Sequence, residues 1–90
     1  MTENEFYKQL IKMKFTRIVT CEGQETNYFY IDLLRVRVVV TKWNSKEYAL
    51  CVRDINDDNF CNNLPLKTFK TLDEKIIKFV KQFVKFLKEE

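Results

Sequence analysis

Residues 33–53 read LLRVRVVVTKWNSKEYALCVR, and this stretch decides the fold. Apolar residues alternate with other residues over 34–41 and again over 48–53, which is the period of a half-buried β-strand. The polar run Asn-Ser-Lys at 44–46 is typical of a turn. The stretch therefore predicts two antiparallel strands joined by a tight turn.

The register of these two strands follows from their apolar residues. A three-residue turn at 44–46 pairs Val40 with Leu50 and Val38 with Val52. The apolar faces of both strands then lie on the same side of the sheet, as a buried face requires. We expect this side to pack against the rest of the core.

Helical patterns flank the β region. Thr2 and Glu5 form a capping-box pattern that opens a helix over about residues 3–13. Thr71 and Glu74 form a second capping box before the last segment. The apolar stripe of that second helix, which we expect to pack on the sheet, contains Ile76, Val80, Phe83 and Leu87.

The remaining segments complete the predicted fold. Residues 15–21 and 28–31 are rich in β-branched and aromatic residues, whereas 54–70 is a long, largely polar connection. The predicted fold class is α+β: a three-stranded antiparallel sheet flanked by N- and C-terminal helices, in the order α-β-β-β-α, in a single domain of residues 1–90. Two helices most simply cover one sheet face and leave the other open.

Composition excludes several classes of function. The 90 residues contain no histidine, one glycine and three cysteines. Without histidine, the chain lacks imidazole bases and every histidine-containing zinc site, and one glycine is too few for a phosphate-binding loop. Cys21, Cys51 and Cys61 form no C-x-x-C motif and suit a reducing cytoplasm. We expect a cytoplasmic protein with no catalytic activity, no cofactor, no metal and no membrane span.

The acidic run after the second strand has one alternative interpretation. Asp54, Asn56 and Asp58 have the spacing that opens an EF-hand loop. Asn59 stands where that loop needs glycine, and Pro65 stands where it needs a bidentate glutamate. A solvated loop with Asx turns explains the run better than a calcium site.

The predicted register also places Arg37 opposite Arg53, which is unfavourable for two like charges. Either an acidic group separates them or the face that carries them binds something. We expect Val39 and Cys51 to be exposed between them, and arginines interleaved with aromatic residues are typical of docking and base-stacking surfaces. The long connection at 54–70 is expected to dock together with this face, and the lysine face of the last helix is an alternative binding surface. The predicted partner-binding residues are Arg35, Arg37, Arg53, Tyr28, Tyr30 and Trp43.

The order α-β-β-β-α resembles that of the double-stranded-RNA-binding domain. That family has a lysine-rich start to its last helix and a glycine-rich middle, whereas this helix starts Thr71-Leu72-Asp73-Glu74, so no functional residue is carried over. In size and composition the chain also resembles the small anti-CRISPR inhibitors of phages. These resemblances imply a protein that docks on a larger protein or ribonucleoprotein complex of host defence, with nucleic-acid binding as the alternative; the oligomeric state is left open.

Overall fold

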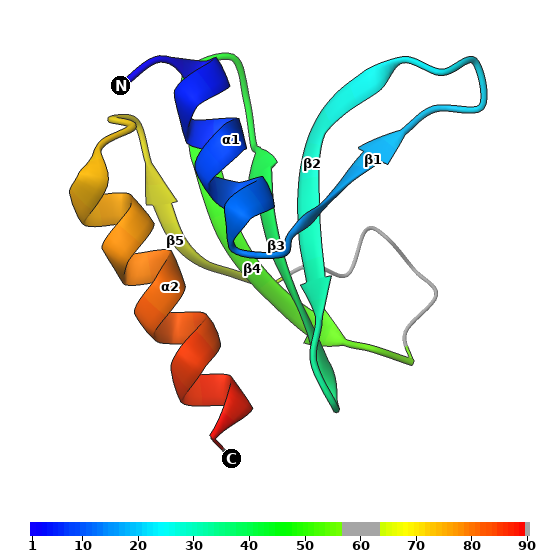
Figure 1. Cartoon of the computed structure of the whole chain (residues 1–90), viewed down its shortest axis with the longest axis vertical. Coiled ribbons are helices and arrows are strands. Elements are labelled where there is room, and N and C mark those ends of the chain that lie inside the picture. Colours follow the sequence, from blue (N-terminus) through cyan, green and yellow to red (C-terminus); the bar gives the residue numbers. More distant parts are fainter. Residues whose placement is uncertain (57–63, 90) are drawn as a thin grey trace.

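The computed structural model describes residues 1–56 and 64–89 and shows a sheet with two helices on one of its faces (Figure 1). The elements follow one another as α1 (Glu3–Lys12), β1 (Thr16–Val19), β2 (Glu25–Asp32), β3 (Val36–Lys42), β4 (Tyr48–Asp54), β5 (Leu64–Phe69) and α2 (Glu74–Lys88). The class α+β and the flanking helices are confirmed. The sheet has five strands, not the expected three.

The two additional strands have separate causes. One forms because 33–35 is a turn, so that the β-rich stretches on either side of it are separate strands, β2 and β3. The other is β5, which lies within the connection expected over 54–70. The order α-β-β-β-α is therefore wrong, and the topological resemblance to the double-stranded-RNA-binding domain, which rested on it, is lost. In the acidic run whose spacing resembles an EF-hand loop, Asp58 and Asn59 lie outside the described residues. Cys61 also lies outside them.

The sheet is an antiparallel meander in which each strand pairs with its neighbour in sequence. The predicted register of β3 and β4 is confirmed: Val38 lies opposite Val52, and Val40 lies opposite Leu50. Because side chains alternate across a strand, Val38, Val40 and Leu50 all point to the face that the helices cover.

The helix α1 begins as its capping pattern predicts. The Thr2 hydroxyl accepts a hydrogen bond from the Glu5 amide at 3.2 Å. Phe6 and Leu10 recur at helical spacing and are completely buried. The ring of Phe6 lies 5.9 Å from that of Tyr48 and 6.0 Å from that of Phe69. The first helix thus closes the core over β4 and β5.

The helix α2 begins differently from the prediction. Its N-cap is Asp73, whose carboxylate accepts a hydrogen bond from the Ile76 amide at 3.0 Å, and not Thr71. Val80 and Val84 are its buried residues. The other members of its apolar stripe, which pack against the core while half-buried, are Ile76, Ile77, Phe83 and Leu87.

Candidate functional site

The sheet face away from the helices carries the two arginines that face each other. Arg37 lies opposite Arg53, and Asp32 lies beside Arg37 on β2. Arg37 donates from Nε to Asp32 Oδ1 and from Nη2 to Asp32 Oδ2, the second bond at 2.9 Å. This bidentate pair raises the pKa of Arg37. The guanidinium also lies 4.3 Å from the centre of the Tyr30 ring. An acidic group therefore pairs with one arginine, but it lies on the side of Arg37 away from β4 and not between the two arginines, as one of the two predicted explanations required.

The apolar centre of this face is closed. Val39, Ala49 and Cys51 are 0% exposed and form a small second core, against which Tyr28 and Tyr30 pack. Burial raises the pKa of the Cys51 thiol to about 11. The expectation that Val39 and Cys51 are exposed is wrong, because large neighbouring side chains cover them.

Arg53 belongs to the same closed face, because it is only 5% exposed. Replacing it with glutamate would put a buried carboxylate where a buried guanidinium stands, so such a change is expected to destabilise the fold. Tyr28 is half-buried. The structure thus brings four of the six predicted residues onto one face, Tyr28, Tyr30, Arg37 and Arg53, but as parts of its packing.

The other two predicted residues lie apart, at the two ends of β3. Arg35 is exposed in the β2–β3 turn, where its carbonyl accepts a hydrogen bond from the Ile55 amide at 3.2 Å. Trp43 is 49% exposed in the turn between β3 and β4. The six residues therefore do not form one continuous surface, and their role in binding stays a prediction.

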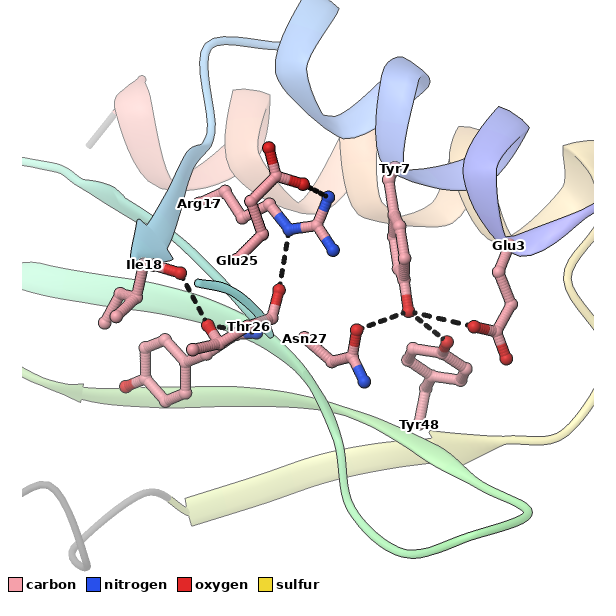
Figure 2. Close-up of polar contacts among 9 residues, drawn as sticks. Glu3, Tyr7, Arg17, Ile18, Glu25, Thr26, Asn27 and Tyr48 are labelled. Carbon is pink, nitrogen blue, oxygen red and sulfur yellow. Dashed lines mark hydrogen bonds and ion pairs between the residues drawn. The ribbon is translucent and has the colours of Figure 1, made fainter. Parts of the chain in front are cut away.

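A polar cluster joins α1 to the sheet (Figure 2). Tyr7 Oη lies 2.6 Å from Tyr48 Oη and 3.0 Å from Asn27 Oδ1. Glu3 accepts from Tyr7 at 3.3 Å and from Lys42 at 3.2 Å, and the Lys42 bond lowers the pKa of Glu3. Burial raises the pKa of both phenols, and the hydrogen bond between the two hydroxyls raises the pKa of Tyr48 further. Both phenols therefore stay protonated at neutral pH, which suits hydrogen bonding in a core and not base catalysis.

A second feature of the helix-side face is Arg17 on β1. Its guanidinium lies 4.7 Å from the Tyr7 ring centre and 5.2 Å from that of Phe29. It also donates to Glu25 at 2.7 Å and to the Thr26 carbonyl at 2.6 Å (Figure 2). These contacts hold the β1–β2 hairpin against α1. They also engage the Arg17 guanidinium in interactions within the fold.

Among the residues that the structure describes, the turn between β2 and β3 carries the most exposed large apolar side chain. Leu34 is 89% exposed, whereas its neighbour Leu33 packs against the core. This turn and the C-terminal end of α2 lie at the same end of the molecule (Figure 1). We call this region the hairpin end; its residues line a cleft of about 280 Å³ and are Leu33, Leu34, Arg35, Val36 and Leu87.

The hairpin end was missed in the sequence because its turn looks like strand. Gly, Pro, Asn, Asp and Ser dominate turns for conformational reasons, and none of them occurs at 33–36. The available signal was the alternation itself: it continues through Leu34 and Arg35 without a break, and nothing in the pattern says where the chain reverses.

Both edges of the sheet carry features that disfavour the addition of another strand. The edge strand β5 contains Pro65, which has no amide proton to donate, and the exposed Lys67. The other edge strand, β1, has four residues and a register shift between Arg17 and Val19. A partner is therefore expected to contact side chains and not to extend the sheet.

Within residues 1–56 and 64–89, no group of three His, Cys, Asp or Glu side chains is placed to hold a metal ion. Neither α1 nor α2 is long and apolar enough to cross a membrane. Comparison of the chain with protein-family models, with curated proteins and with solved structures finds no match.

Proposed function

We propose that this chain is a non-catalytic binding protein that docks on a larger protein through the hairpin end. The observation that carries the proposal is the 89% exposure of Leu34 in a turn that also lacks turn-forming residues. Neither core packing nor backbone conformation accounts for a leucine at this position.

The surroundings of Leu34 give the surface the composition of a docking site. A single exposed leucine is ordinary, but Leu34 borders a cleft with the partly buried Val36 and Leu87. Arg35 is exposed beside it and supplies directed hydrogen-bond donors. Phe86, which precedes Leu87 on α2, is 61% exposed. Arginine and aromatic residues are the types that are enriched at protein interfaces.

The proposal extends to a cytoplasmic inhibitor of a host-defence complex, of the anti-CRISPR kind, with a larger protein or ribonucleoprotein as partner. Its support is the small size, the absence of histidine and the thiols of Cys21 and Cys51, both of which are free. An inhibitor of this kind acts by occupying a surface and needs no catalytic group.

The test compares Leu34→Ser with Leu66→Ser in capture experiments. Leu66 is 55% exposed on β5, so the control removes an exposed leucine outside the hairpin end. Each protein is immobilised and exposed to lysate of the host cell, with and without nuclease. We expect wild type and Leu66→Ser to capture the same protein and Leu34→Ser to capture at least about tenfold less, equivalent to about 1.4 kcal/mol.

Three results would decide against the proposal. Equal capture by Leu34→Ser and wild type would show that the hairpin end is not the docking surface. Loss of the captured material after nuclease treatment, together with a steep dependence on salt, would favour the alternative function of nucleic-acid binding. Loss of capture by Leu66→Ser to the same extent would point to a general effect on folding.

A further inference from the structure

A groove lies between α2 and the C-terminal end of α1, and it shares no lining residue with the hairpin-end cleft. Its volume is about 270 Å³, and it is lined by Met13, Lys81, Val84, Lys85 and Lys88. α1 ends at Lys12, and its C-cap is Met13. The shorter helix α1 stops while α2 continues toward the C-terminus (Figure 1).

The floor of the groove is aliphatic. Val84 is 7% exposed, and Met13 is half-buried against the core. A methionine side chain is flexible and polarisable and adapts its shape to different apolar partners. This floor suits an aliphatic side chain of a ligand.

The rim of the groove is entirely basic. Lys81, Lys85 and Lys88 are exposed, and none of them takes part in an ion pair with the part of the chain that the structure describes. Their spacing of four and three residues places them along one flank of α2, with rises of about 6 Å and 4.5 Å along the helix axis. Lys85 and Lys88 lie in the last turn, where they also favour the helix dipole, but Lys81 does not.

We propose that this groove binds an acidic amphipathic segment of a partner protein. An aliphatic side chain of the segment would pack on Met13 and Val84, while carboxylates that recur along the segment would meet the three lysines. The inference shares with the proposed function only the idea of a protein partner, and it uses none of the hairpin-end residues.

The composition of the groove favours a protein segment over a nucleic acid. Single-stranded nucleic acids bind where basic side chains alternate with aromatic rings on which bases stack. None of the five lining residues is aromatic, whereas the exposed rings of α2, Phe79 and Phe86, do not line the groove. Lysines alone would hold phosphates but would leave the apolar floor unused.

The probe is a labelled synthetic peptide of two heptads, with leucine at the a and d positions and glutamate elsewhere. Its dissociation constant is measured by fluorescence anisotropy. In parallel, NMR of protein labelled at the methionine methyl groups follows Met13, whose signal Met13→Leu identifies. We expect the Met13 signal to shift and saturate with the same dissociation constant. A peptide with glutamine in place of glutamate is expected to bind at least about tenfold more weakly.

The matched variants each remove three positive charges. Lys81→Gln/Lys85→Gln/Lys88→Gln takes them from the groove, whereas Lys46→Gln/Lys70→Gln/Lys75→Gln takes them from exposed positions elsewhere. Circular dichroism and thermal melting establish that both are folded. We expect the groove variant to weaken peptide binding at least about tenfold and the control variant less than about twofold.

Several outcomes would overturn the inference. The proposal fails if the peptide does not shift Met13, or if both triple variants lose affinity equally, since net charge alone would then explain binding. It also fails if oligothymidylate shifts Met13 with equal or higher affinity than the peptide, which would make the groove a nucleic-acid site. Leu34→Ser is expected to bind the peptide normally, so failure here and failure of the hairpin-end proposal remain distinguishable.

Discussion

Arg37 and Arg53 face each other on neighbouring strands, and the structure accommodates them unequally. Arg37 forms a bidentate pair with Asp32, while Arg53 is buried. The sequence predicts that they lie opposite each other, because strand register is determined by local alternation. It does not predict their different surroundings, because those depend on which side chains of the other neighbouring strands lie next to each.

The buried thiol and phenol groups on the two sides of the sheet determine how stability depends on pH. Burial raises the pKa of the Cys51 thiol to about 11, and the pKa values of Tyr7 and Tyr48 are also raised. Above about pH 9 the unfolded chain releases thiol and phenol protons that the folded chain still holds. The free energy of unfolding is therefore expected to fall as the pH rises from neutral to about 10. Urea denaturation at the two pH values measures it.

The control for this pH dependence is Cys51→Ala, which removes one of the shielded protons. Its stability is expected to depend less on pH than that of the wild type, whatever its absolute value. An unchanged free energy of unfolding between neutral pH and about pH 10 in the wild type would contradict the shielding of these groups.

At the scale of the elements, two residues before α2 have the sequence pattern of an N-cap, and the structure shows which of them caps the helix. Asp73 accepts the amide hydrogen bond of Ile76, whereas Thr71 lies two residues before it. Replacing an N-cap residue by alanine costs about 1 kcal/mol. We expect Asp73→Ala to be destabilised by about that amount and Thr71→Ala by less than about 0.5 kcal/mol in chemical denaturation. A larger loss of stability for Thr71→Ala than for Asp73→Ala would show that Thr71 is the N-cap.

The elements also show where sequence reasoning reaches its limit. The pairing of β3 with β4 is predictable because Val38 and Val40 require apolar partners on the same face. β5 is not, because Pro65 is unusual in strands and its neighbour Leu66 is exposed. A register shift between Leu50 and Cys51 accommodates this strand, and alternation alone cannot show such a shift.

The candidate site was less predictable than the fold. The sequence predicts Arg35 as a binding residue, but its alternation places Leu34 in a strand and on an apolar face. Whether a leucine is a core residue or an exposed one depends on where the chain turns. The burial of Val39 and Cys51 depends in the same way on how the side chains of β2 pack over them.

For the whole molecule, the more deeply buried phenylalanine of the core belongs to α1 and not to α2. Phe6 is completely buried among aromatic rings, whereas Phe83 is half-buried. We expect Phe6→Ala to cost about 3–5 kcal/mol, enough to unfold much of a domain whose total stability is of the order of 5–15 kcal/mol. Phe83→Ala is expected to cost about half as much. Urea denaturation provides the comparison.

Phe6→Leu keeps this comparison measurable if the alanine variant does not fold. We expect it to be folded and less stable than the wild type, because leucine fills only part of the space of the ring. A larger loss for Phe83→Ala than for Phe6→Ala would show that α2, and not α1, carries the core.

The meander also has a consequence for how the chain folds during its synthesis. Each strand pairs with the one made just before it, so pairing closes only short loops and begins before the chain is complete. Phe6, in contrast, precedes every strand in the sequence, and its ring contact with Phe69 forms only after β5 has been made. Until then the apolar side of the nascent sheet lacks its full cover. The period between these two events is when the growing chain is most prone to aggregate.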